Sequence, residues 1–375
     1  GIPVMSVAFG QKGRCEMRLF EIPMVTMSLL GFCFLAGAGT PAAHADFIYG
    51  EPTNLGAAVN SPGNEVAPYL SPDGRELYFL DASHGLAMVA RRATVDSEWG
   101  QATNPSPQFR NLDGAGPGCI TPDGLTLFIQ SDRPGGCGGV DLWTATRATA
   151  DSDWGTPTNL GAVVNSTSDD FFPSVSADGL ELYFMSVRPG GSGCEDLYVA
   201  KRATVNDAWG TPVNLSMLNT PTYDSFPSIS PDGLLLFFSS QRADGYGGGD
   251  IYVARRASRK DPWGPPTNCG PVVNTPYVEW APSVSADGSM LYFHSNRPGG
   301  LGGLDIWQAP IVPVVDFDAD GKVDLLDLTL LIGNWATNDT LYDIGPFAWG
   351  DGVVDIEDLK VFIAEWEKEN PPAEP

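Results

Sequence analysis

The chain has 375 residues, with 21 Lys and Arg against 46 Asp and Glu, and therefore a formal net charge of −25 at pH 7. This charge argues against a nucleic-acid or anionic-membrane surface, because phosphate binding depends on Lys and Arg. Glycine occurs 44 times and proline 32 times without a collagen period, which indicates many tight turns and an all-β architecture.

The first segment has the three parts of a secretory signal. A basic start at Met17 is followed by an apolar stretch over 27–36 and an Ala-x-Ala ending at Ala45. We therefore assign 1–45 to upstream residues and a signal peptide, with cleavage after Ala45. The mature protein is expected to be secreted, periplasmic or on the cell surface. A buried N-terminal helix is the alternative.

Between residues 46 and 310 a string of the form Ser-x-Asp-Gly-x-x-Leu-(Tyr/Phe)-Phe recurs, once with a looser match. Its aspartates are spaced 50 to 55 residues apart, at Asp73, Asp123, Asp178, Asp232 and Asp287. A period of about fifty with strand-like segments is typical of propeller blades with four strands each. The five copies predict an all-β, five-bladed β-propeller over 46–310, followed by a linker over 311–315.

The outermost strand of one blade is displaced in the sequence. Segment 49–55 matches the fourth strand of a repeat but precedes the first copy, whereas the last copy has no fourth strand after residue 310. We expect the N-terminal segment to complete the last blade, which closes the ring and removes free sheet edges.

The full repeat is clearest over 285–307, where Ser-x-Asp-Gly-x-x-Leu-Tyr-Phe leads through Arg-Pro-Gly-Gly to Gly-Gly-x-Asp-Ile-Trp. It resembles the WD40-like PD40 repeat of TolB-type propellers and of the N-terminal propeller of tricorn protease. The resemblance implies a propeller that serves as a binding or interaction platform, although one fold hosts many activities.

Acids recur three residues before the proline of each first strand. They are Glu65, Asp170, Asp224 and Glu279, with Asp113 one place earlier in the second repeat. We expect these acids and the loop arginines, among them Arg188 and Arg297, around one mouth of the channel, where a ligand could bind. The alternative, which their recurrence favours, is that acid and arginine pair with each other within each blade.

The first repeat breaks this symmetry. It has Asp81-Ala-Ser-His-Gly where the others carry the arginine-glycine loop, which predicts a gap in the rim. Tyr246, Tyr277 and Trp280 are expected in loops of the same face, and exposed aromatic rings can stack on sugars. These features predict a saccharide or peptide bound across blades 4, 5 and 1. The alternative for Trp280 is a role in filling the core.

The cysteines and catalytic motifs add little. Cys137 and Cys194 fall in equivalent loops of neighbouring repeats, which predicts a disulfide between blades 2 and 3. No nucleophile-elbow, zinc-protease or phosphate-loop motif is present, so we assign no catalytic residue.

An acidic segment follows the linker and has the spacing of a calcium loop. Carboxylates stand at loop positions 1, 3, 5, 9 and 12, namely Asp316, Asp318, Asp320, Asp324 and Asp327. The Lys322 carbonyl serves at position 7, and glycine stands at position 6, as calcium loops require. Solvated acidic helix ends are the alternative.

A second copy lies 31 residues further on and supplies Asp351, Asp355 and Asp358. Its positions 1 and 3 are Phe347 and Trp349, so we expect Asp343 to supply the missing ligand through an enlarged loop. The same offset maps Leu331, Ile332 and Trp335 onto Phe362, Ile363 and Trp366. These matching apolar faces predict two helices that pack together.

Aspartate at position 12 resembles the dockerin domain, type I, rather than a usual EF-hand. The resemblance implies a small α-helical, calcium-binding domain over 316–368, with a tail over 369–375, that attaches secreted proteins to a cohesin-type partner. About half of the net charge lies in this segment, where 15 acids face 3 lysines over 316–375.

These patterns together predict an exported, non-enzymatic, monomeric binding protein. Its propeller would recognise a carbohydrate or protein, and a calcium-dependent dockerin-like module would tether it. One alternative is a secreted polysaccharide-degrading enzyme, a glycoside hydrolase or lyase, with Asp113 paired with Glu65 or Asp170. The other is a protein-interaction platform in the envelope.

Overall fold

The computed structural model describes residues 47–104, 117–150, 152–339 and 341–369. The predicted signal peptide from Met17 to Ala45 and the candidate Asp113 lie outside these ranges. Within them, no helix has the length and apolar character needed to cross a membrane.

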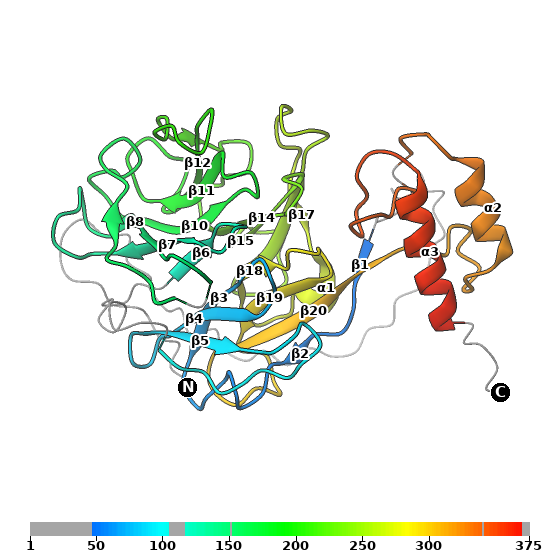
Figure 1. Ribbon diagram of the computed structural model, residues 1–375, viewed down its shortest axis with the longest axis horizontal. Helices are drawn as coiled ribbons and strands as arrows, with labels where there is room; N and C mark the ends of the chain where they lie inside the picture. The colour runs from blue at the N-terminus through cyan, green and yellow to red at the C-terminus, as the bar shows by residue number, and fades with distance from the viewer. Residues whose placement is uncertain (1–46, 105–116, 151, 340, 370–375) are drawn as a thin grey trace, which may run out of the picture. The chain divides into compact units, whose positions relative to one another are not determined.

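Five antiparallel sheets follow one another along the chain and form the blades of a β-propeller (Figure 1). Blade 1 contains β3 (Glu65–Leu70), β4 (Glu76–Asp81) and β5 (Leu86–Arg91). Blade 2 contains β6 (Pro117–Ile120), β7 (Thr126–Ser131), β8 (Asp141–Thr146) and β9 (Thr158–Asn159). Blade 3 contains β10 (Asp170–Val175), β11 (Glu181–Ser186), β12 (Asp196–Lys201) and β13 (Val213–Asn214).

The remaining blades repeat the pattern. Blade 4 contains β14 (Asp224–Ile229), β15 (Leu235–Ser240), β16 (Asp250–Arg255) and β17 (Thr267–Asn268). Blade 5 contains β18 (Glu279–Val284), β19 (Met290–Ser295) and β20 (Asp305–Pro313). The five-bladed architecture predicted from the repeats is confirmed.

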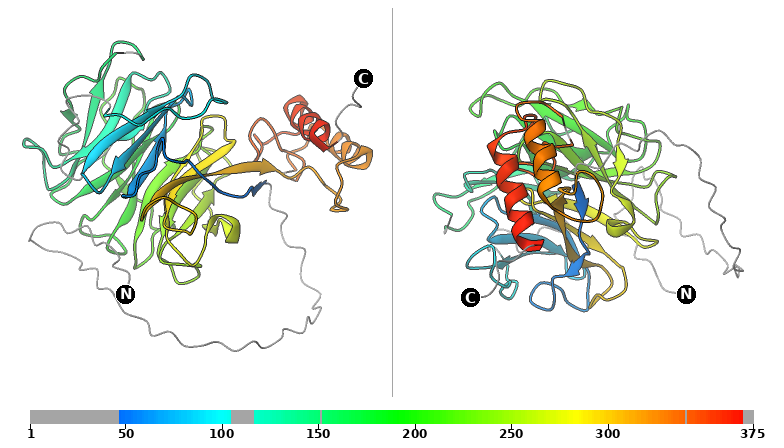
Figure 2. Two further views of the ribbon diagram at one scale, coloured as in Figure 1. Left: turned by 90° about the horizontal axis from the view of Figure 1, so that it is seen from below. Right: turned by 90° about the vertical axis from the view of Figure 1, so that its right-hand side faces the viewer.

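Blade 5 is completed from the N-terminal side. The strand β2 (Thr53–Asn54) pairs with β20, with Thr53 opposite Gln308, so the predicted ring closure is confirmed. The strand β1 (Phe47–Tyr49) pairs with a later part of β20 and runs beside it in both views of Figure 2. Because β1 supplies this second partner, β20 continues to Pro313, into the stretch predicted as a linker over 311–315.

The Ser-x-Asp-Gly string forms each hairpin by satisfying its own backbone. In blade 1, Ser71 Oγ donates to Asp73 Oδ1 at 2.6 Å and accepts from Glu76 N at 2.8 Å. Gly74 has φ +69°, a left-handed conformation that a side chain would strain. The same string therefore forms the turn between the first two strands of every blade.

Apolar residues between successive blades form the core. Leu127 of β7 and Val89 of β5 share one buried cluster, as do Leu77 of β4 and Ile306 of β20. The second of these clusters joins the first blade to the last, so the ring is closed by burial of apolar surface as well as by the β2–β20 pairing.

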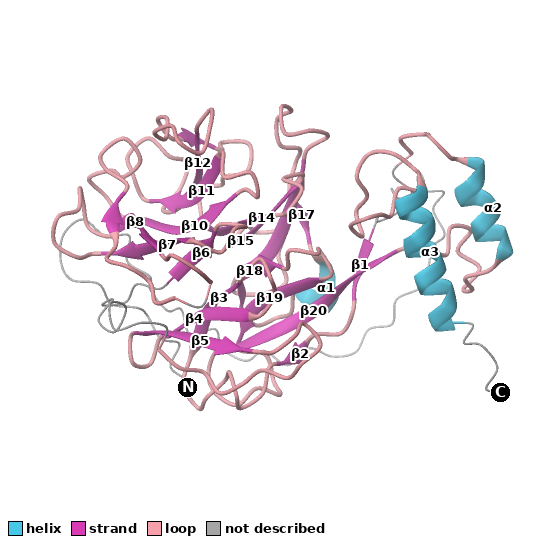
Figure 3. Ribbon diagram, in the orientation of Figure 1, coloured by secondary structure: helices cyan, strands magenta, loops and turns pink. Residues whose placement is uncertain are grey.

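Two of the three helices in the described part of the chain follow the last propeller strand (Figure 3). The helix α1 (Gly270–Val273) is one turn within blade 4, whereas α2 (Leu325–Gly333) and α3 (Ile356–Glu369) follow β20. Leu331 and Phe362 are both fully buried in one cluster, so the predicted packing of the two helices is confirmed. Ile332 and Ile363 are exposed, which corrects the prediction that they belong to this core.

Candidate functional site

The central channel of the propeller is nearly filled. A hollow of about 40 Å³ remains, lined by Pro68, Pro173, Pro227 and Pro282, which lie in the first strands of blades 1, 3, 4 and 5, and by their neighbours. The rings of Phe172 and Phe226 lie 3.7 Å apart between centroids. No acid belongs to the described residues that line the hollow. The described residues of the channel therefore offer neither room nor carboxylates for a sugar ring.

The recurring acids do not surround the channel mouth as expected. Asp170, Asp224 and Glu279 are the first residues of β10, β14 and β18 and are fully buried. A bulge two residues later puts Phe172, Phe226 and Ala281 in left-handed conformations with φ from 50° to 54°. Because of the bulge, the channel is lined by residues that follow the acids, not by the acids themselves.

Each of these buried acids is neutralised by the arginine of its own blade. Arg188 Nη2 donates to Asp170 Oδ1 at 2.6 Å, and Arg242 Nη2 donates to Asp224 Oδ1 at 3.0 Å. Arg297 and Glu279 form the corresponding pair at 3.2 Å. The alternative that acid and arginine pair within each blade is therefore the correct one for blades 3 to 5.

Glu65 in blade 1 is the exception. It is buried at the start of β3, where it accepts hydrogen bonds from the backbone N and Oγ of Ser61. Burial and the nearby carboxylates of Asp305 and Asp81 raise its pKa. Among the described residues, no lysine or arginine forms an ion pair with it.

The three candidate aromatic residues divide into two kinds. Tyr246 and Tyr277 are exposed on adjacent loops, where Gly248 N donates to the Tyr277 carbonyl at 3.0 Å. Trp280 is the second residue of β18 rather than a loop residue, and its ring lies 5.8 Å from that of Phe226. It fills space beside the channel, which agrees with the alternative prediction that Trp280 fills the core.

The predicted disulfide between Cys137 and Cys194 is absent, because Cys137 is a free thiol. Its sulfur lies 3.9 Å from Asn159 Oδ1, on the outer strand of its own blade. Equivalent loop positions in neighbouring blades do not bring the two sulfurs together.

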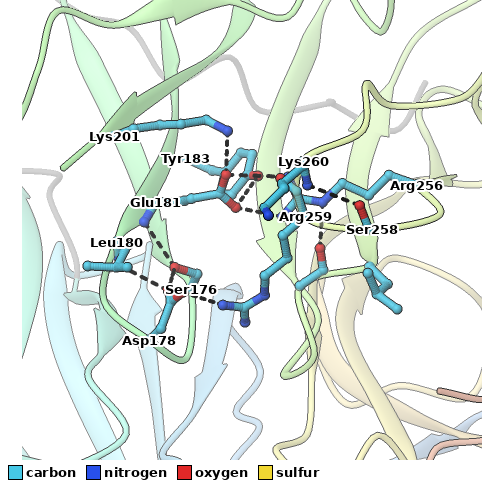
Figure 4. A network of polar contacts seen from close by, with 12 residues as sticks. Ser176, Asp178, Leu180, Glu181, Tyr183, Lys201, Arg256, Ser258, Arg259 and Lys260 are labelled. Carbon is cyan, nitrogen blue, oxygen red and sulfur yellow. Dashed lines mark hydrogen bonds and ion pairs between the residues drawn. The ribbon is translucent and has the colours of Figure 1, made fainter. Parts of the chain in front are cut away.

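A polar network that the sequence analysis missed joins blades 3 and 4 (Figure 4). Glu181 at the start of β11 accepts from Arg256 Nη2 at 2.6 Å, from Tyr183 Oη at 3.0 Å, and pairs with Lys201 at 2.5 Å. Burial opposes ionisation of Glu181, but its hydrogen bonds to Arg256 and Lys201 prevail and lower its pKa to about 2.

The same network recurs between blades 1 and 2, with Glu76 in place of Glu181 and Arg147 in place of Arg256. In each case the arginine also lies over a tryptophan of the Trp-Gly pair, Trp154 or Trp263. Glu76 and Glu181 stand at the same motif position two repeats apart, and this was the signal available in the sequence.

The first acidic loop brings together three of the five carboxylates that the calcium spacing singles out. Oxygens of Asp316, Asp318 and Asp320 all lie within 4.8 Å of one another. Asp316 accepts from Asp320 N and Gly321 N, which wraps the loop around it. Asp327 is buried and accepts from Phe317 N and Asp324 N. The hard oxygen donors of this loop suit calcium.

The second loop repeats this wrapping around a different residue. Asp343 accepts from Asp351 N at 2.8 Å and from Gly352 N at 2.6 Å, as Asp316 does from Asp320 and Gly321. Asp358 accepts from Ile344 N and Asp355 N, as Asp327 does from Phe317 and Asp324. Asp343 therefore takes the place of Asp316, and the loop is four residues longer.

The extra residues carry Phe347 and Trp349, which accordingly are not at ligand positions. Trp349 is buried, and its indole Nε1 donates to Asp232 Oδ2 at 2.6 Å, in the β14–β15 hairpin. Its ring also lies 5.9 Å from that of Phe47. The enlargement of the second loop thus provides an apolar contact with propeller strands.

Apolar side chains are exposed at matching positions of the two helices. Leu325 and Ile356 begin α2 and α3 and are 65% and 49% exposed, and Ile332 and Ile363 are 53% and 43% exposed. Each pair is related by the 31-residue repeat. The repeat therefore exposes apolar residues at the same positions of both copies.

No protein family matches the sequence, and no curated protein matches it. Solved structures do resemble the fold. TolB from Acinetobacter baumannii has 14% identity and a TM-score of 0.42 over 73% of this chain and 65% of its own. A putative TolB from Agrobacterium tumefaciens has 16% identity and a TM-score of 0.42 over 72% and 100%. An alpha-L-arabinofuranosidase from Lactobacillus brevis has 14% identity and a TM-score of 0.43 over 67% and 91%.

This chain therefore spans just under two thirds of the first TolB. At such identities the likeness concerns the propeller fold alone. These neighbours are named as TolB proteins in two cases and as an alpha-L-arabinofuranosidase in the third.

Proposed function

We propose that this protein is an exported, non-enzymatic binding protein. Its propeller recognises a carbohydrate or protein ligand, and its C-terminal dockerin-like module tethers it, with calcium bound, to a cohesin-type partner. The observation that carries the tethering half is the duplication of the carboxylate loop, with Asp316 and Asp343 holding the same backbone groups.

The geometry of the channel favours binding over hydrolysis. A glycosidase needs two carboxyl groups about 5 to 9.5 Å apart on either side of a bound sugar. The hollow of about 40 Å³ in the channel holds no such pair among the described residues. Asp170, one candidate for a catalytic pair, is committed to Arg188 inside blade 3. The exposed rings of Tyr246 and Tyr277 are better suited to stacking on a ligand.

In the module, the first loop would hold calcium through Asp316, Asp318, Asp320, the Lys322 carbonyl, Asp324 and Asp327. The second loop would use Asp343, Asp351, Asp355 and Asp358. Calcium would offset the repulsion among these carboxylates and so fix the two helix starts. Leu325 and Ile356, which begin the helices, would then be presented to the partner.

This half of the proposal predicts calcium-dependent binding of the full chain to immobilised cohesin modules, measured by surface plasmon resonance in calcium and in chelator. Asp316→Ala removes a ligand, so binding should fall at least about tenfold. Leu325→Asp with Ile356→Asp should abolish binding while leaving calcium uptake, measured by calorimetry, unchanged. Val205→Asp, at an exposed apolar residue of the propeller, is the matched control. Absence of calcium uptake by the wild type would contradict the assignment.

A further inference from the structure

Arginine occupies the same place in blades 3, 4 and 5. In blade 3, Arg188 Nε donates to Ser186 Oγ at 2.9 Å, and its Nη2 donates to Asp170 and to the Val164 carbonyl at 2.8 Å. Its guanidinium lies 4.8 Å from the centre of the Tyr198 ring. Arg242 and Arg297 make the corresponding contacts in their own blades. The slot is built to hold a guanidinium group.

Blade 1 has the slot but not the arginine. Glu65 lies opposite Asp81 in the β3–β4 register, as Asp170 lies opposite Ser186 in blade 3. An acid thus replaces the serine, and Ser83 stands two residues later, where the arginine would be. The loop backbone is the same, because Ala82 N donates to the Asn64 carbonyl at 2.8 Å, as Val187 N does to Asp169.

The space of the missing side chain is a cavity of about 410 Å³. Its walls include the counterparts of the groups around Arg188. Glu65 corresponds to Asp170, Asp81 to Ser186 and Val59 to Val164. Phe79 and Met88 correspond to the rings of Phe184 and Tyr198. This volume lies in the range of small-ligand sites. Leu301, half exposed in a loop of blade 5, also lines it. We call it the blade 1 pocket.

The two carboxylates of the blade 1 pocket are poorly neutralised. Asp81 accepts from the backbone N of Ser83 and of His84 and pairs with the His84 side chain at 2.8 Å, but this imidazole is 71% exposed and carries charge only when protonated. Glu65 has only Ser61 as a hydrogen-bond donor in the described part of the chain. A buried carboxylate is costly unless a cation or further donors satisfy it.

We propose that the blade 1 pocket binds the guanidinium group of an arginine side chain supplied by a ligand. The guanidinium would take the position that Arg188 holds in blade 3, between the two carboxylates and the Val59 carbonyl, with its stem along Phe79 and Met88. A planar fork of donors suits a site with two carboxylates better than an ammonium does. The site lies in blade 1 and is independent of the calcium loops.

The test is isothermal titration of the full chain with L-arginine amide, with the peptide Gly-Arg-Gly, and with L-citrulline amide. Citrulline has nearly the shape of arginine but no charge. We expect both arginine compounds to bind and citrulline to bind at least about tenfold more weakly, because a charge-assisted pair is lost. Tighter binding of the peptide would indicate an arginine within a protein segment, and equal affinities would indicate free arginine as the ligand. Equal affinity for citrulline, or no binding of any arginine compound, would overturn the proposal.

Variants of the chain make the test specific. Glu65→Gln should weaken arginine binding at least about tenfold, whereas Glu98→Gln, at an exposed acid, should leave it unchanged. Asp81→Ser with Ser83→Arg restores the residues of the other blades, so the chain should fill its own pocket, melt at a higher temperature and bind no arginine. Retained binding in this double variant would contradict the assigned location, even if Glu65→Gln fails to fold.

Discussion

Replacement of Glu181 by alanine is expected to lower the free energy of unfolding by about 3 to 5 kcal/mol. The substitution leaves Arg256, whose side chain is 2% exposed, without its carboxylate partner inside the interface between blades 3 and 4. A buried charge that loses its partner keeps its desolvation cost, so the penalty exceeds that of an exposed ion pair. Urea unfolding monitored by tryptophan fluorescence measures the effect.

Two further variants separate the charge from the packing. Glu98→Ala removes an exposed acid and should change the free energy of unfolding by less than about 0.5 kcal/mol. Glu181→Leu combined with Arg256→Met removes both charges and should recover much of the loss, because no unpaired charge remains. If Glu181→Ala costs less than about 1 kcal/mol, the network does not hold the two blades together as described.

Acidification from pH 7 to pH 5 is expected to destabilise the propeller through His294. This imidazole is buried, its Nδ1 accepts from Ala67 N at 3.2 Å, and burial lowers its pKa to about 3. In the unfolded chain the pKa is about 6.5, so below that pH the unfolded state binds the additional proton. Stability is therefore lost as the pH falls below about 6.5, by about 1.4 kcal/mol per unit down to about pH 3.

The matched variant for this prediction comes from the chain itself. In blade 2, Gln130 Oε1 accepts from Phe172 N at the position that His294 holds in blade 5. Between pH 7 and pH 5 the wild type should lose about 2 kcal/mol more of its free energy of unfolding than His294→Gln does. Parallel pH dependences of the two proteins would show that His294 is not buried as a neutral acceptor.

The repeat pattern was sufficient for the fold because its local chemistry is complete. Ser71, Asp73 and Gly74 satisfy one hairpin among themselves, so a string of residue types marks the same turn in every blade. The number of repeats predicted the number of blades. The fourth-strand segment that precedes the first repeat, around Thr53, predicted how the ring closes.

The location of the acids could not be predicted in the same way. Phe172 and its counterparts adopt left-handed conformations at a bulge, and this bulge decides which residues line the channel. Phenylalanine and alanine rarely adopt positive φ, so their residue types gave no sign of the bulge. The acids consequently became partners of arginines instead of rim residues. The pairing of acid with arginine was favoured by their recurrence in the sequence, and the absence of Arg-Pro-Gly-Gly in blade 1 was visible there as well.

The enlarged second loop was predicted from the sequence, but the contact that its extra residues make with the propeller was not. A fixed offset of 31 residues matched Asp320 with Asp351 but placed Phe347 opposite Asp316. The backbone hydrogen bonds show that Asp343 holds the first position and that four additional residues carry Trp349 outward to Asp232. The four inserted residues shift the alignment of the two copies before the insertion, and the offset of 31 residues holds only after it.

The central claim is that the propeller binds its ligand without cleaving it. The direct measurement is one incubation of the full chain with a panel of plant and microbial polysaccharides, assayed in parallel for retention of the protein and for release of reducing ends. We predict retention on at least one polysaccharide, weakened by Tyr246→Ala with Tyr277→Ala, and no release of reducing ends. Release that increases with time and protein concentration would contradict the claim.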